Sequence, residues 1–141
     1  MHINYQLYSK CYSILIGVGN YAHLKELKSP KKDVLELKKC LEDLCFEKTP
    51  NNENVLLCEK ATKEGIEQMF YKFEKKLEGK TKKENIENGK SLLVIYFSGH
   101  GSKHTKGINN VFYLCPYDFE GKNFFFSYKN SQQKKFFRKF S

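Results

Sequence analysis

The sequence predicts an α/β fold in which helices cover a mainly parallel sheet. Two apolar runs end in small residues, at 12–19 and 91–101, and a shorter run lies at 54–58. Segments with helical spacing of apolar residues separate these runs, one beginning near residue 29 and one near residue 62. Alternation of strands and helices favours parallel pairing, because each helix returns the chain to the same end of the sheet.

The run from Ser91 to Gly101 carries the strongest functional signal. Its six consecutive apolar residues predict a strand buried on both faces, and it ends in Ser-Gly-His-Gly. Open α/β sheets place their sites at the carboxyl ends of strands, which makes His100 a candidate functional residue. Gly99 and Gly101 would leave room for a ligand backbone, and the N–H of Gly101 could face a reacting carbonyl. The alternative is a histidine that only caps a strand end beside a turn.

The first helix is predicted to begin at Ser29-Pro30, a hydroxyl followed by proline at the first helical position. It should end near Cys45-Phe46. Asp33 lies in its first turn, where the helix dipole favours a carboxylate. A substrate-facing acid is the second interpretation of Asp33. One apolar face is expected from Val34, Leu37, Leu41 and Leu44.

The remaining elements follow the same reasoning. Thr62 is the expected cap of a second helix, whose apolar stripe runs to Leu77 and is best explained as a core face. We expect a charged loop at 79–90 and a polar, mobile stretch at 102–110. Val111–Cys115 is predicted to be a further strand. The pattern fails beyond Gly121, so we predict a domain at 11–121 and a basic, Phe-rich tail at 122–141.

Two other motifs give weak signals. Gly17-x-Gly19 partly fits a dinucleotide fingerprint, but a loop follows it and the region twenty residues on is helical. His104 stands four residues after His100, a spacing used by metal pairs on helices. The glycine between them disfavours a helix and no carboxylate or cysteine cluster completes a ligand set. We therefore predict no metal site.

Composition limits the compartment and the partners. The chain of 141 residues has a net charge of +9, and the segment 122–141 contains five Lys, one Arg and no acid. A solvated basic end explains this charge better than a specific nucleic-acid site. Five cysteines without a CxxC pair indicate reduced thiols, and hence a cytoplasmic location. No apolar run approaches the ~18 residues of a membrane span, so no transmembrane segment is expected.

In their order and spacing, these pieces resemble the large-subunit (p20) region of the caspase-like cysteine peptidases. The resemblance covers roughly residues 11–120 and is closer to paracaspases and metacaspases than to caspases proper. It implies a caspase-like three-layer sandwich, cut off after about the fourth strand. The segments that carry it are Tyr12–Tyr21, Leu27–Val34, Ala61–Glu64, Tyr96–Gly101 and Tyr113–Asp118.

The resemblance assigns roles to three residues. His100 matches the catalytic histidine, and Gly101 matches the glycine whose backbone N–H helps to hold the oxyanion. Asp33 matches an acid that lines the S1 pocket of paracaspases and metacaspases and selects Arg or Lys at P1. A polypeptide substrate and a caspase-like or adaptor partner are therefore implied. No cofactor is expected, although calcium dependence occurs in the family.

The nucleophilic cysteine of the family has no match. It follows the histidine by ~50 residues, which counts to a position beyond Ser141. Cys115 is the last cysteine of the chain, and it stands where the family has a core residue. We therefore expect a cysteine endopeptidase domain cut off before its nucleophile, inactive by itself. The alternatives are a non-catalytic caspase-like module that binds or regulates a partner, and, more weakly, a nucleotide-binding domain.

Overall fold

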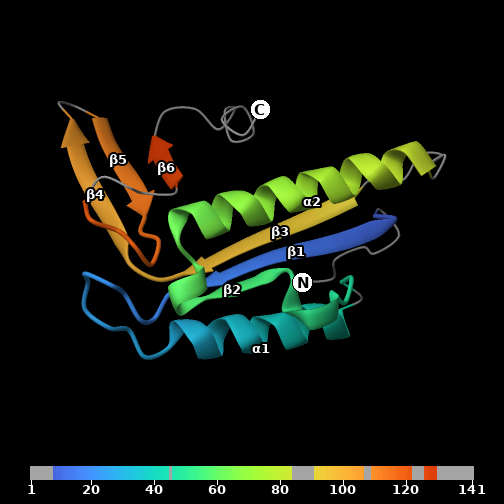
Figure 1. The fold of residues 1–141 in the computed structure, drawn as a ribbon, viewed down its shortest axis with the longest axis horizontal. Coiled ribbons are helices and arrows are strands. Elements are labelled where there is room, and N and C mark those ends of the chain that lie inside the picture. Colours follow the sequence, from blue (N-terminus) through green and yellow to red (C-terminus); the bar gives the residue numbers. More distant parts are fainter. Residues whose placement is uncertain (1–7, 45, 84–90, 107–108, 122–125, 130–141) are drawn as a thin grey trace.

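A three-stranded parallel sheet forms the centre of the protein (Figure 1). Its strands lie in the order β2-β1-β3, and β1 pairs with both neighbours. The computed structural model describes residues 8–44, 46–83, 91–106, 109–121 and 126–129. The strands of this sheet are β1 (Lys10–Gly17), β2 (Val55–Leu57) and β3 (Ser91–Ser98), and two 3₁₀ turns, Pro50–Asn52 and Cys58–Lys60, flank β2.

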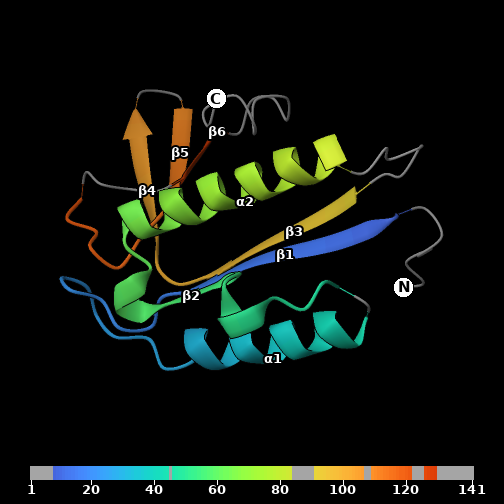
Figure 2. The same cartoon turned by 45° about the vertical axis from the view of Figure 1, so that its right-hand side comes forward.

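Helices α1 (Pro30–Asp43) and α2 (Lys63–Lys83) cover opposite faces of this sheet (Figures 1 and 2). Side chains alternate along β1, because successive residues of a strand point to opposite faces. On the α2 side, one core cluster contains Ile14, Ile16 and Ile66, and on the α1 side another contains Leu15 and Val34. The predicted three-layer α/β architecture is confirmed.

The helix ends differ in how they are capped. Helix α1 begins at Pro30 as predicted, but the Ser29 side chain makes no capping hydrogen bond, and the helix ends at Asp43, short of the predicted end. At the start of α2, the Thr62 hydroxyl accepts the N–H of Gly65 (3.0 Å), as expected of a cap. The Asp118 carboxylate also accepts the N–H of Lys63 there (2.9 Å).

Helix α2 continues to Lys83, so the prediction of a loop from residue 79 was wrong for its first part. The residues between 72 and 83 are mostly Lys and Glu, which lose little side-chain freedom in a helix. A single glycine among them does not interrupt the helix. Residues 84–90 of the predicted loop lie outside the described residues.

A second, antiparallel sheet follows β3, with strand order β4-β5-β6 (Figure 2). The predicted strand at Val111–Cys115 appears as β5. It belongs to this second sheet and not to the parallel one. The prediction of a mobile stretch was wrong where β4 forms, because pairing with β5 satisfies the backbone whatever the side chains are. Periodicity did not predict β6. The strands are β4 (Gly101–Lys106), β5 (Asn109–Leu114) and β6 (Phe126–Lys129).

Strand β3 is less buried than predicted. Ile95 is 39% exposed, and most of the other β3 residues are only half-buried. Within the described residues β3 pairs with β1 alone, so one of its edges has no neighbouring strand there. The apolar run correctly predicted the strand but not its burial, which requires neighbours at both edges as well as on both faces. Among the residues that the structure describes, no helix is long and apolar enough to cross a membrane.

Candidate functional site

His100 follows the carboxyl end of β3, and the loop after β1 contacts its imidazole. The ring Nε2 lies 2.7 Å from the backbone carbonyl oxygen of Lys25. Because a carbonyl oxygen can only accept, this contact requires Nε2 to carry a proton. In the neutral imidazole the lone pair then resides on Nδ1. The arrangement leaves Nδ1 available to take a proton from another group.

Tyr21 holds the backbone of His100. The Tyr21 hydroxyl accepts the backbone N–H of His100 (2.6 Å) and donates to the carbonyl oxygen of Cys115 (3.2 Å). Its ring lies against the imidazole, with 4.9 Å between the ring centroids. Burial raises the pKa of the Tyr21 phenol to about 12, although the hydrogen bond from His100 opposes this shift. The phenol is therefore neutral, and able to donate, at physiological pH.

This shift makes stability depend on pH in alkaline solution. Because the folded-state pKa exceeds the ordinary value of 10.0, the unfolded chain loses the Tyr21 proton first as pH rises. The stability that Tyr21 contributes is complete below pH 10.0 and is lost as pH rises toward about 12. We expect the difference in free energy of unfolding between wild type and Tyr21→Phe to shrink across this interval. Urea titrations at stepped pH measure it, and a constant difference would contradict the assignment.

The two glycines beside His100 have different roles. A Cβ on Gly99 would lie 2.5 Å from the Tyr21 hydroxyl oxygen, so Tyr21 fills the space that we predicted for a ligand backbone. A Cβ on Gly101 would meet only the Tyr113 carbonyl oxygen, at an ordinary 3.6 Å. The prediction of ligand space is therefore wrong for Gly99, while Gly101 retains room around it.

The N–H of Gly101 is directed away from β5. Cys115 donates its N–H to the carbonyl of His100 (3.0 Å), which makes these two residues a hydrogen-bonded pair. Gly101 and Leu114, one step further along, are then a non-hydrogen-bonded pair, whose N–H groups point outward. Since β4 is an edge strand among the described residues, the Gly101 N–H points toward an edge without a neighbouring strand.

Asp33 lies at the same edge of the sheet as His100. The Ser98 hydroxyl, at the end of β3, donates to the Asp33 carboxylate at 3.4 Å. The two meet because α1 begins where β1 ends, which brings its first turn beside the carboxyl end of β3. The Asp33 side chain is half-buried. Asp33 thus lies beside Ser98, which is two positions before His100, although Asp33 and Ser98 are 65 positions apart in the sequence.

The glycines at the end of β1 serve packing. A Cβ on Gly17 would lie 2.8 Å from the Pro30 carbonyl oxygen, and one on Gly19 would lie 2.6 Å from that of Leu27. These glycines bring β1 and the following loop close to the start of α1. The space that a dinucleotide phosphate would need is filled by backbone, which removes the main support for a nucleotide site.

The cysteines in the described part of the chain do not supply an evident nucleophile. Cys115 is hydrogen-bonded to His100 only through backbone, and its side chain is 1% exposed in the core. Burial raises the pKa of the Cys115 thiol, which disfavours the thiolate. Cys58 follows β2, and β1 lies between that strand and β3. Among the described residues, no group of three or more His, Cys, Asp or Glu is placed to hold a metal ion.

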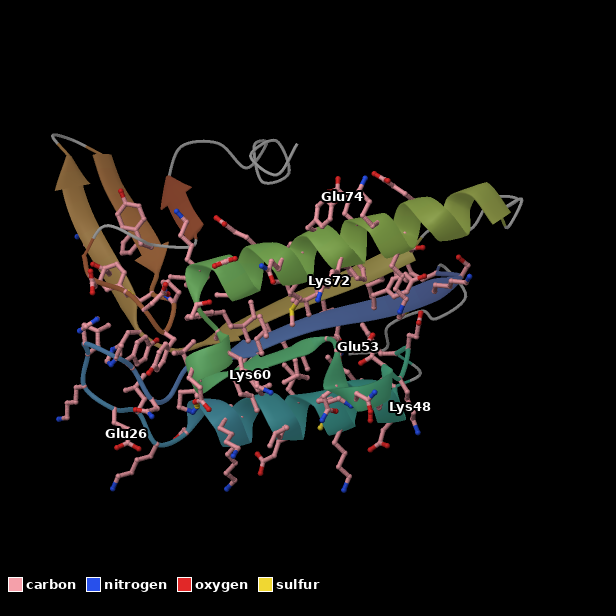
Figure 3. All side chains as sticks on the ribbon, in the orientation of Figure 1. Glu26, Lys48, Glu53, Lys60, Lys72 and Glu74 are labelled. Atoms are coloured by element: carbon pink, nitrogen blue, oxygen red, sulfur yellow. The ribbon has the colours of Figure 1, made fainter. Side chains whose placement is uncertain are left out.

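A cavity of about 390 Å³ lies elsewhere, between α2 and β1. Apolar side chains such as Ile14 and Phe73 line it, together with Lys72 and Glu53, both of which Figure 3 labels. Its charged lining is mixed, and Lys76 also borders the cavity. No residue of the His100 site lines it, so it is separate from the candidate active site.

The contacts of Tyr21 and Lys25 with His100 were not predicted. Asn20-Tyr21 was recognised only as part of a family pattern, and Lys25 acts through its backbone carbonyl, which every residue type possesses. The one available signal was a tyrosine two positions after Gly19, near a glycine-rich strand end.

One comparison with known proteins gives a match. The caspase-domain model of the peptidase C14 family matches residues 10–136, which is most of the chain. No curated protein and no solved structure shows significant similarity to it.

Proposed function

The chain belongs to the caspase domain family of the C14 peptidases, and from this premise we propose that it acts in a cysteine endopeptidase with His100 as acid and base. The contact that carries the proposal is the hydrogen bond of 2.7 Å between His100 Nε2 and the Lys25 carbonyl. It fixes the tautomer in which Nδ1 has the lone pair. Such an imidazole can serve a thiol nucleophile in a polypeptide-cleaving site.

The proposed reaction has two stages. Nδ1 of His100 takes the thiol proton, the thiolate attacks the peptide carbonyl, and the imidazolium then returns the proton to the leaving amine. Water, deprotonated by the same nitrogen, hydrolyses the thioester. The outward N–H of Gly101 suits the developing oxyanion, since it makes no bond to β5. The Lys25 carbonyl accepts from Nε2 in both protonation states, so the ring keeps its orientation.

Asp33 is the proposed determinant of substrate preference. Its carboxylate is half-buried at the same edge of the sheet, with the Ser98 hydroxyl as a neutral partner. A carboxylate in this setting favours a cationic side chain through charge-assisted hydrogen bonds. We therefore propose that the site prefers Arg or Lys at P1. This preference is the feature shared with paracaspases and metacaspases.

We expect Asp33→Asn to lower kcat/KM for Arg-P1 peptides by about 10- to 100-fold, because hydrogen bonds to charged groups contribute about 1.5–3 kcal/mol. The measurement uses a polypeptide that continues this chain through a cysteine-bearing strand, with His100→Ala as the inactive baseline. Glu36→Gln is the matched control, since Glu36 is an exposed acid on the same helix, 3.8 Å from Lys32. An unchanged Arg preference in Asp33→Asn would refute the assignment.

Cys115 supports a second candidate function. Its buried thiol, with a raised pKa, cannot serve His100 as a ready nucleophile. A caspase-like module that binds or regulates a partner without cleaving peptides would have this property. A caspase-like or adaptor protein is the class of partner proposed for such a module. Activity measurements on the chain with and without a further cysteine-bearing segment separate the two functions.

A further inference from the structure

The Tyr21 hydroxyl lies between the backbones of His100 and Cys115, one step beyond the ladder of β4 and β5. The register of β4 and β5 places His100 opposite Cys115, and a hydrogen-bonded pair in an antiparallel ladder normally exchanges two backbone bonds. Only one is direct here, from the Cys115 N–H to the His100 carbonyl at 3.0 Å. The other passes through Tyr21, which accepts from the His100 N–H at 2.6 Å and donates to the Cys115 carbonyl at 3.2 Å.

The surroundings are shaped for this hydroxyl. Tyr21 is 7% exposed, so water does not readily replace its oxygen. A Cβ on residue 99 would lie only 2.5 Å from the Tyr21 hydroxyl oxygen, so the hydroxyl fits here because residue 99 is glycine. The adjacent Ala22 N–H donates to the Tyr117 carbonyl at 3.1 Å, which ties the loop to the segment after Cys115. Hydrogen bonds therefore hold the side-chain hydroxyl of Tyr21 and also the backbone next to it.

From these contacts we infer that Tyr21 is a positioning residue for the His100 imidazole. The hydrogen bond from Nε2 to the Lys25 carbonyl lies in an exposed part of the site, where water competes for both partners. That bond persists only if the ring is already directed at the carbonyl. Tyr21 orients the imidazole in two ways. Its hydroxyl accepts the backbone N–H of His100, and its ring contacts the imidazole ring. The inference rests on the proposed role of His100.

A purely structural role would require only the ring. Tyr21 belongs to a core cluster with Val18 and Cys115, and phenylalanine would fill this space almost as well. What phenylalanine cannot do is connect the His100 N–H to the Cys115 carbonyl. The hydroxyl, rather than the ring, is therefore the group whose removal separates positioning from packing.

The test is the tautomer of His100, read from long-range ¹H–¹⁵N spectra of the imidazole ring. The wild-type chain should show one tautomer, with the proton on Nε2. In Tyr21→Phe the two tautomers should mix, because the ring loses its direction toward Lys25. Gly99→Ala should give the same mixed spectrum, since its Cβ would displace the Tyr21 hydroxyl. His100→Ala identifies the signals.

Tyr12→Phe is the matched control. Tyr12 is also a buried tyrosine of the β1 region, and its ring packs edge-on against Phe73, with 5.4 Å between centroids, away from His100. It should leave the His100 spectrum unchanged. A folded Tyr21→Phe with the wild-type ring spectrum would overturn the inference, and so would a wild-type ring that is not protonated on Nε2. If Tyr21→Phe does not fold, Gly99→Ala decides by the same measurement.

This measurement does not depend on peptide cleavage. Mixed tautomers in the variants, together with a longer polypeptide that cleaves no peptide, would uphold the positioning role and refute the proposed peptidase. An unchanged tautomer in Tyr21→Phe, together with cleavage that requires His100, would refute the positioning role and uphold the proposed peptidase.

Discussion

The 141-residue chain by itself is expected to leave fluorogenic peptides ending in Arg or Lys uncleaved, with or without calcium. Its last cysteine, Cys115, is buried, and burial raises the pKa of the thiol, so this residue offers His100 no ready thiolate. Removal of the nucleophile from a peptidase triad lowers kcat by about 10⁶-fold. Turnover should therefore not exceed that of a His100→Ala variant prepared in the same way.

The comparison has two arms. In the first, turnover that disappears in both His100→Ala and Cys115→Ala would contradict the expectation and make Cys115 the nucleophile. In the second, a polypeptide extended through a downstream cysteine-bearing strand is assayed with the same peptides. Activity restored there and abolished by His100→Ala supports the endopeptidase, whereas an inert extended protein supports the non-catalytic module.

Gly19→Ala is expected to destabilise the fold by about 1–3 kcal/mol, the usual cost of forcing extra volume into packed structure. The new Cβ would lie 2.6 Å from the Leu27 carbonyl oxygen, which is backbone and cannot rotate away. Leu27 also donates its N–H to the Gly19 carbonyl (2.8 Å), so the substitution strains the closure of the loop that carries Tyr21 and Lys25. Urea denaturation measures the loss.

Gly79→Ala is the matched control for this substitution. Gly79 lies in the exposed part of α2, and a Cβ there would meet nothing within 4 Å. Alanine should stabilise this helix by about 0.5–1 kcal/mol, since glycine loses more freedom than alanine on folding. Two glycine-to-alanine substitutions should thus change stability in opposite directions. Equal effects would show that the loop around Gly19 adapts without strain.

Local patterns determined the elements that surround the site. The apolar run before His100 predicted β3, and Ser29-Pro30 predicted the start of α1 with Asp33 in its first turn. These predictions depend on periodicity and on terminal residue types, which act within a few positions of the chain. Strand–helix alternation then predicted parallel pairing, and with it the shared edge at which His100 and Asp33 lie.

Local patterns were misleading where backbone pairing decides structure. The polar segment after Gly101 offered no apolar alternation, yet it forms β4 because β5 is beside it. The apolar run of β3 indicated full burial, but its exposure depends on what lies at each edge. Pairing satisfies backbone groups, which all residues share, so side-chain patterns carry little information about it.

The sequence by itself determined that this protein is an α/β domain in which His100 stands at a strand end among glycines. Only the tertiary structure decided how that histidine is held. The hydroxyl that fixes its backbone comes from Tyr21, 79 positions earlier, and the carbonyl that fixes its tautomer comes from Lys25, 75 positions earlier. Each of these hydrogen bonds joins a backbone group to a distant segment. No spacing rule encodes such contacts, because they exist only after the sheet and the loop after β1 have folded together.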